Sequence, residues 1–171
     1  MATTLRSRLP DIVAADHVAF QCTYFEKSQA SNWLVALHQD LSIPVLEKIP
    51  HPALRGWSQK DGELHVQAPD VLLEQLVAIR LHLDDCDANN GALSVVPGSH
   101  ALGRLRAADA LAARERCGTL LCPVARGGVM ALRPLLLHAS SKASGSQRRR
   151  VLHFVFGPRE LPFGLRWARA V

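Results

Sequence analysis

Short runs of apolar residues, separated by turn-forming residues, recur along the whole chain. Within these runs apolar and polar positions alternate or β-branched residues dominate, which is typical of strands. Helical periodicity is sparse and confined to residues 70–75 and 107–116. Many short strands with so few helices predict an all-β sandwich or barrel with minor helices, because alternating βα units would need a helix after nearly every strand. The runs that predict strands lie at residues 18–25, 33–38, 63–67, 76–83, 92–96, 120–124, 128–132, 135–139 and 149–156.

A histidine and an aspartate stand at the end of the second predicted strand. His38 and Asp40 are two positions apart, so on extended backbone both side chains point to the same face. His138 lies in another predicted strand, about a hundred residues later. Two histidines and one carboxylate are the ligand set of non-heme Fe(II) enzymes, and this set leaves positions open for a co-substrate and O2. The alternatives are an ordinary His–Asp hydrogen bond at a strand end and, for His138, a core histidine.

Several motifs occur together with this trio in a recognisable order. They are His38-Gln39-Asp40, the segment 83–85, the segment Asn90-Gly91 to Pro97-Gly98-Ser99-His100, the segment 137–141, and the segment 149–153. In this combination the chain resembles the phytanoyl-CoA dioxygenase family of Fe(II)/2-oxoglutarate oxygenases. The resemblance runs from about residue 17 to the C-terminus. One departure is that only thirty-seven residues precede His38, where family members carry a long, largely helical segment.

The resemblance implies a fold and a set of site residues. The fold is the double-stranded β-helix, an eight-stranded jelly roll, which also fits the predicted strands. The implied iron ligands are His38, Asp40 and His138, and Arg149 is the implied anchor for the distal carboxylate of 2-oxoglutarate. A role for Gln39 in binding the co-substrate rests on the resemblance alone. Ser140 shares a face with His138, so it either bonds the co-substrate carboxylate or simply forms a turn.

The choice of Arg149 depends on strand register. We expect residues 135–140 to pair with residues 147–155 as the last hairpin, which places position 138 opposite position 149 and turns Arg149 into the barrel. A slip by one residue would instead present Arg148 or Arg150, and the whole basic run could also lie on the surface. A guanidinium in the barrel would balance the dianionic co-substrate and fix its direction through a bidentate contact.

Two further residues are candidates for contact with the primary substrate. Arg80 interrupts an apolar predicted strand, where a charge is costly without a partner. It either pairs with Asp84 or projects into the site and meets an anionic substrate. Trp57 either belongs to a loop over the mouth of the site or packs on the core.

Composition limits the remaining possibilities. With 171 residues and 48% hydrophobic content, the chain is expected to form one domain, residues 1–171. The net charge of +5 does not indicate nucleic acid binding, because acidic and basic residues are interspersed and aromatic residues make up only 5%. Residues 1–10 lack the apolar segment of a signal peptide, and no run of apolar residues approaches the ~18 needed for a membrane span. Four irregularly spaced cysteines indicate reduced thiols rather than a zinc site, and we expect a soluble, cytoplasmic protein.

Taken together, the sequence predicts an Fe(II)- and 2-oxoglutarate-dependent dioxygenase. It would use O2 to hydroxylate a small polar or anionic organic molecule, with release of succinate and CO2. Two alternatives stay open: a jelly roll that binds a ligand without catalysis, and a metalloenzyme on the same barrel that does not use 2-oxoglutarate. Neither the primary substrate nor the oligomeric state can be read from the sequence.

Overall fold

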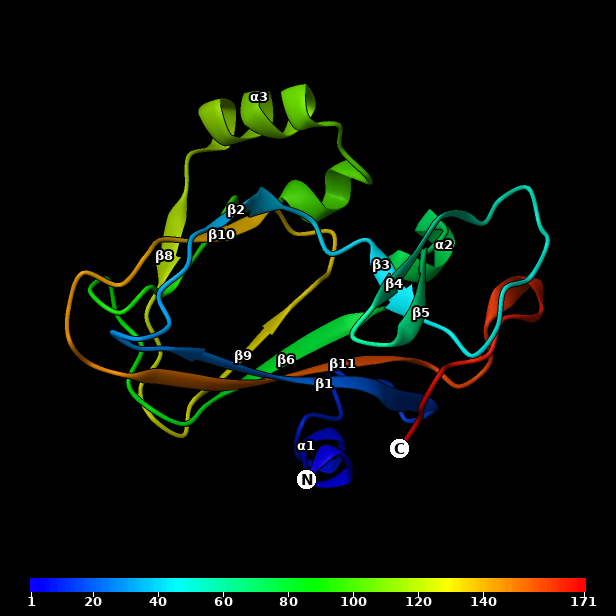
Figure 1. Ribbon diagram of the computed structural model, residues 1–171, viewed down its shortest axis with the longest axis horizontal. Coiled ribbons are helices and arrows are strands. Elements are labelled where there is room, and N and C mark those ends of the chain that lie inside the picture. The colour runs from blue at the N-terminus through cyan, green and yellow to red at the C-terminus, as the bar shows by residue number, and fades with distance from the viewer.

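The computed structural model describes residues 1–171 and contains two four-stranded antiparallel sheets that face each other (Figure 1). The first sheet has the order β1–β11–β6–β9, with β1 (His17–Lys27), β11 (Arg149–Pro158), β6 (Val77–His82) and β9 (Val129–Leu132). The second has the order β2–β10–β7–β8, with β2 (Val35–His38), β10 (His138–Ser140), β7 (Leu93–Val95) and β8 (Leu120–Cys122). This arrangement confirms the predicted double-stranded β-helix.

Smaller elements surround the two sheets. A third sheet of order β3–β5–β4 is formed by β3 (Ser42–Pro44), β5 (Glu63–Gln67) and β4 (Arg55–Lys60). The helices are α1 (Ala2–Arg8), α2 (Asp70–Leu73) and α3 (Ala107–Cys117), with 3₁₀ turns η1 (Ser99–Leu102) and η2 (Pro162–Gly164). The sequence pattern predicted α2, α3 and β5 but not α1, β3 or β4. No helix in the structure combines the length and the apolar character that crossing a membrane requires.

The main core includes residues of both sheets and continues under the small third sheet. Its largest aromatic contact is a stacked pair, Phe20 and Trp167, with ring centroids 3.8 Å apart. The outer faces are covered by helices at opposite sides of the molecule (Figure 1). Helix α1 packs Leu5 against a cluster that includes Ile79 and Phe156 of the first sheet, and the small residues of α3 pack on the second. This packing leaves the facing sides of the sheets to build a site.

The predicted last hairpin is wrong. Strand β10 pairs with β2 and β7, whereas β11 pairs with β1 and β6, so the two strands lie in opposite sheets. Residues 135–137 also lie outside the strand, because the chain turns there and the N–H of Leu136 donates to the carbonyl of Arg133. The physical reason is topological: the segment 141–148 carries the chain from one sheet to the other, and both strands find partners far away in the sequence. Position 149 therefore lies opposite Lys27 and not opposite His138.

Candidate active site

Three predicted metal ligands meet at one end of the second sheet. His38 is the last residue of β2 and lies directly opposite His138, the first residue of β10, with ring centroids 4.2 Å apart. Asp40 follows just beyond β2, where its backbone N–H donates to the carbonyl of Pro134 at 2.9 Å. Its carboxylate oxygens lie 3.4 Å from Nε2 of His38 and 3.7 Å from Nε2 of His138. One ligand atom from each residue lies within 4.8 Å of the others.

The protonation of the two histidines suits a metal ion. In each ring Nδ1 lies 2.8 Å from the carbonyl oxygen two residues earlier, of Ala36 for His38 and of Leu136 for His138. A carbonyl only accepts, so Nδ1 carries a proton in both rings, and Nε2 is the atom of each ring that points toward Asp40 and that a metal ion would bind once it is unprotonated. Donors on one face of an octahedron lie roughly 3 Å apart when each metal bond is about 2.1 Å. The two spacings between histidine and aspartate exceed that value by less than 1 Å, so an adjustment of the side chains would close the site on an ion.

The pKa shifts in the trio favour an ionised Asp40 and a neutral His138. Burial alone would raise the pKa of Asp40, but the hydrogen bond from His38 and the nearby charges of His138 and His153 lower it to about 2. Burial lowers the pKa of His138, which opposes protonation of its ring. The hydrogen bond to Asp40 raises the pKa of His38. At neutral pH the site therefore offers an ionised carboxylate beside a His138 ring that is held neutral.

A second cluster joins the two sheets around the carbonyl of Gly91. Nη1 of Arg149 donates to this carbonyl at 2.6 Å, and Oγ of Ser140 donates to it at 2.8 Å. Nζ of Lys27 donates to Oγ of Ser140 at 2.6 Å and to the carbonyl of Ser141 at 2.5 Å. The hydroxyl proton of Ser140 is thus committed to Gly91, and its oxygen positions Lys27. A direct bond from Ser140 to the co-substrate stays a prediction that would require this hydroxyl to rotate.

The cluster contains two buried cations and no carboxylate. Lys27 is completely buried and Arg149 is 3% exposed, and neither takes part in a salt bridge. Nε of Arg149 is a buried donor without a partner. Burial and the nearby charge of Arg149 lower the pKa of Lys27 to about 8, so most of it remains charged at pH 7. An anion in the cavity would compensate both charges.

Glycine is required at position 91 to form this cluster. Its backbone has φ of +81°, and a Cβ there would lie 2.8 Å from the carbonyl oxygen of Ser141 and 3.0 Å from Nζ of Lys27. Any larger residue would push Lys27 out of place.

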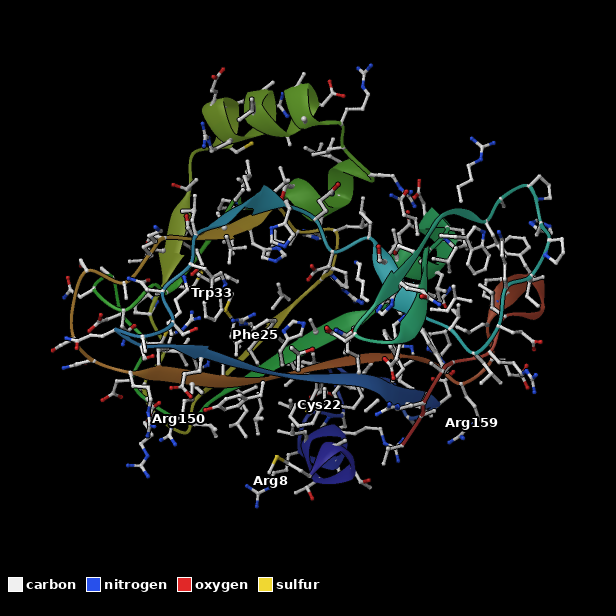
Figure 2. The ribbon with its side chains drawn as sticks, viewed as in Figure 1. Arg8, Cys22, Phe25, Trp33, Arg150 and Arg159 are labelled. Atoms are coloured by element: carbon white, nitrogen blue, oxygen red, sulfur yellow. The ribbon has the colours of Figure 1, made fainter.

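Of the three consecutive arginines, only Arg149 faces the space between the sheets. Arg150 points to the outer side, where its guanidinium and backbone N–H donate to the carboxylate of Asp84 at 2.8–2.9 Å (Figure 2). Arg148 is exposed. Position 149 therefore faces inward, although the strand pairing from which we expected this was wrong, and the role of Arg149 as the carboxylate anchor stays a prediction. Alternation along β11 fixes the orientation instead.

Arg80 also points into the barrel. It is 6% exposed, its Nη1 lies 3.3 Å from Nδ1 of His153, and its guanidinium lies 5.6 Å from the ring centre of Phe25. The alternative partner, Asp84, is occupied by Arg150 on the outer side. Burial and the charge of Arg149 lower the pKa of Arg80 to about 10, which leaves it cationic at neutral pH. Nε of Arg80 has no partner.

Two predicted site residues have structural contacts instead. The side-chain amide of Gln39 donates to the carbonyls of Gly103 and Leu135 and accepts from the N–H of Leu105, at 2.7–2.8 Å. These hydrogen bonds hold the end of β2 against the neighbouring loops. A contact of Gln39 with the co-substrate stays a prediction. Trp57 lies in β4, packs against the main core and carries Nζ of Lys48 5.8 Å from its ring centre. It does not line the cavity described next.

A cavity of about 930 Å³ connects the trio with Arg80 and Arg149, and Lys27 lies behind its wall, bonded to Ser140. Sequence reasoning missed two residues that matter here, Lys27 and His153. His153 could have been found by alternation, since it is four positions after Arg149 on the same strand face. Lys27 carried no such signal, because a lysine at a strand end is usually exposed. The polar residues that line the cavity around the trio are His38, Asp40, Arg80, His138, Ser140, Arg149 and His153.

Comparison with known families supports what this geometry suggests. Residues 5–151 match the family described as Phytanoyl-CoA dioxygenase (PhyH). The chain belongs to the phytanoyl-CoA dioxygenase family. The resemblance inferred from the motifs is thereby confirmed. A search of curated proteins gives no match.

Solved structures of the same fold include several non-heme enzymes. EvdMO1 has a TM-score of 0.65 at 20% identity over 91% of this chain. SnoK, an alpha-ketoglutarate-dependent carbocyclase from nogalamycin biosynthesis, has a TM-score of 0.59 at 16% identity over 84%. HygX from Streptomyces hygroscopicus, solved with nickel, 2-oxoglutarate and hygromycin B, has a TM-score of 0.55 at 18% identity over 90%.

The chain spans less than two thirds of each of these proteins: 30% of EvdMO1, 51% of SnoK and 61% of HygX. At these identities the likeness concerns the fold. Fe(II) and 2-oxoglutarate are the cofactors of this family, and the donor set of His38, Asp40 and His138 fits such an ion.

Proposed function

We propose that this protein is an Fe(II)- and 2-oxoglutarate-dependent dioxygenase that hydroxylates a small polar or anionic organic molecule, with release of succinate and CO2. One observation carries the proposal. A single cavity holds a trio of two histidines and one aspartate together with Arg149, a buried guanidinium that lacks an anionic partner. The trio can bind a metal ion, and the guanidinium can bind a carboxylate. The family's co-substrate, 2-oxoglutarate, carries two carboxylates.

His38, Asp40 and His138 would hold the iron, which with 2-oxoglutarate and O2 supplies the oxidising chemistry when bound. The remaining residues position the co-substrate. Arg149 offers its free Nε–H to the distal carboxylate. Lys27 lies opposite Arg149 on the neighbouring strand and adds a second positive charge behind Ser140, where its Nζ donates to Ser140 and Ser141. Two cations around one carboxylate would also fix the direction in which the dianion enters.

The proposal also includes the cellular compartment in which the reaction takes place. All four cysteines are free thiols, and Cys86 is buried close to Arg149. Free thiols suit a reducing compartment, so we place the enzyme in the cytoplasm with a small molecule as its substrate.

The test measures metal binding and turnover on the same samples. Purified protein is titrated with Fe(II) under anaerobic conditions, then given 2-oxoglutarate and O2 while succinate is quantified. His138→Ala and Asp40→Ala should lose metal binding and reduce succinate release at least a hundredfold, because each removes one of three ligands. The control is His100→Ala, which changes an exposed histidine. Equal turnover in wild type and both ligand variants would refute the proposal.

The same titration separates the alternatives. Iron binding without any response to 2-oxoglutarate would identify a metalloenzyme that uses another co-substrate. Absence of iron binding in the wild type would leave a barrel that binds a ligand without catalysis.

A further inference from the structure

Arg80 is the buried cation that the proposed function does not use. It stands in the middle of β6, opposite His153 of β11 and Met130 of β9, so it lies at the centre of the first sheet. No salt bridge includes it, and its Nε–H has no acceptor. A buried guanidinium without an ion pair destabilises the fold unless a bound group accepts its hydrogen bonds and balances its charge.

The acids of the neighbourhood are already engaged. Asp84 binds Arg150 on the outer side of the sheet, and an oxygen of Asp85 accepts from the backbone N–H of Arg126 at 2.8 Å. Asp40 is held between the two metal-ligand histidines. Arg80 therefore has no carboxylate of its own within the chain.

A count of charges shows that binding of the co-substrate does not remove the excess positive charge around the cavity. Arg80 and Arg149 line the cavity and Lys27 lies just behind it, and Asp40 is the acid among the metal ligands. The other charged lining residues are two bases and two acids, which cancel: Lys60, Arg169, Asp61 and Glu63. A divalent metal ion and a dianionic co-substrate cancel each other. Two positive charges then remain uncompensated inside the barrel, which is an electrostatic reason for a second anion to bind.

His153 and Phe25 shape the space beside Arg80. Because Nη1 of Arg80 donates to Nδ1 of His153, the neutral imidazole carries its proton on Nε2, which is a second donor. The ring of Phe25 meets His153 edge-on, with centroids 5.7 Å apart, and points from β1 into the space between the sheets (Figure 2). Two donors beside an aromatic face fit an oxyanion attached to an apolar body.

We propose that Arg80, together with His153, binds an oxyanion of the primary substrate, either a carboxylate or a phosphate, and that the substrate's apolar part lies against Phe25. This inference rests on the proposed function, because it assigns the co-substrate to Lys27 and Arg149 and leaves Arg80 for the molecule to be oxidised. Arg80 is then a specificity residue: it selects anionic substrates and sets the distance between their charged end and the metal.

The experiment uses protein loaded with Ni(II) and 2-oxoglutarate, in which binding can be measured without turnover. The probes are inorganic phosphate, a series of small carboxylates with aromatic or alkyl bodies, and the neutral amide of each carboxylate. Thermal unfolding reports binding of each probe, and calorimetry reports 2-oxoglutarate affinity. The variants are Arg80→Gln and Arg80→Lys, with Arg150→Gln as the matched control on the outer side.

At least one carboxylate or phosphate should raise the wild-type unfolding temperature by about 3 °C or more at saturation, and its neutral counterpart should not. Arg80→Gln should weaken that anion at least tenfold while 2-oxoglutarate affinity stays within threefold. Arg80→Lys should keep part of the anion affinity, and it serves as the test variant if the glutamine variant does not fold. Arg150→Gln should match the wild type.

Three results would overturn the inference. One is a loss of 2-oxoglutarate affinity in Arg80→Gln as large as that in an Arg149 variant, which would make Arg80 part of the co-substrate site. Another is stabilisation by neutral probes equal to that by anions. The third is a wild type that no anion of either class stabilises. Failure of the proposed function looks different, because 2-oxoglutarate would then not bind the nickel-loaded wild type at all, whatever the anions do at Arg80.

Discussion

Replacing Lys27 with methionine should leave the stability of the empty protein nearly unchanged at neutral pH while weakening co-substrate binding. Methionine has about the same length and apolar stem as lysine, so the packing around this completely buried side chain is kept. The charge and the two hydrogen bonds to Ser140 and Ser141 are lost. These two changes act on stability in opposite directions.

The magnitudes follow from the lysine's environment. Burial, followed by the charge of Arg149, lowers the pKa of Lys27 from 10.5 to about 8, which corresponds to a destabilisation of about 3 kcal/mol at pH 7. Losing two hydrogen bonds and a cation–π contact with Trp33 costs roughly 2 to 3 kcal/mol. The variant should therefore lie within about 1 kcal/mol of the wild type at pH 7.

The pH dependence distinguishes this account from a purely structural role. Because the folded pKa lies below the unfolded one, the unfolded chain binds more protons between pH 8 and 10.5, and wild-type stability rises with pH through that window. From pH 7 to pH 9.5 the wild type should gain about 2 kcal/mol relative to Lys27→Met. 2-Oxoglutarate should bind the variant roughly 10-fold more weakly at pH 7, since a charge near its distal carboxylate is gone.

Urea unfolding at both pH values and calorimetry with 2-oxoglutarate measure these quantities. Lys142→Met is the control, because Lys142 is exposed and directly follows Ser141, which accepts a hydrogen bond from Lys27. A variant that loses several kcal/mol at pH 7 and shows no difference in pH slope would refute the reasoning. So would unchanged affinity for 2-oxoglutarate.

Two further predictions concern charged groups elsewhere in the barrel. Arg149→Gln should weaken 2-oxoglutarate binding by one to two orders of magnitude, about 1.5 to 3 kcal/mol for a charge-assisted contact, whereas Arg148→Gln should do little; calorimetry that ranks the two variants the other way would assign the anchor to Arg148. Burial, followed by the charge of Arg80, lowers the pKa of His82 to about 4, so stability should fall by up to about 3 kcal/mol as pH drops from 6.5 to 4. His82→Asn should remove that part of the slope in urea unfolding, and an unchanged slope would contradict the assignment.

The parts of the site that the sequence predicted are those fixed by local geometry. His38 and Asp40 share a face because strand periodicity demands it, and His138 is recognisable as the second histidine of a known ligand set. The importance of Arg80 follows from the same kind of reasoning, since a charged side chain in an apolar strand needs a partner of opposite charge, either Asp84 or an anionic substrate. Such arguments need only the neighbouring residues in the chain.

Other features depend on contacts between distant segments. The pairing of β10 with β2 and of β11 with β1 could not be read from the sequence, because a short connection between two strands suggests a hairpin whether or not the chain crosses to the other sheet. Lys27 was missed for the same reason. Its burial comes from Ser140 and Gly91, which lie 64 or more positions away in the chain. Two interpretations of Trp57, a loop over the mouth of the site and core packing, stayed open because nothing in its local sequence shows that β4 packs on the core.

The arginines of this barrel show how a cation kept for binding differs from one kept for structure. Arg150 forms three hydrogen bonds with Asp84, so its charge is satisfied before any ligand arrives, and Arg150→Gln should only remove a partly exposed ion pair worth about 1 kcal/mol or less. Arg80 and Arg149 each keep a buried Nε–H without a partner, so the empty protein bears the desolvation of both charges, and each charge lowers the pKa of Lys27. Every anion that enters relieves part of that repulsion. Removing an interior cation should consequently weaken ligand binding far more than it weakens the empty fold, whereas removing Arg150 should affect only the fold.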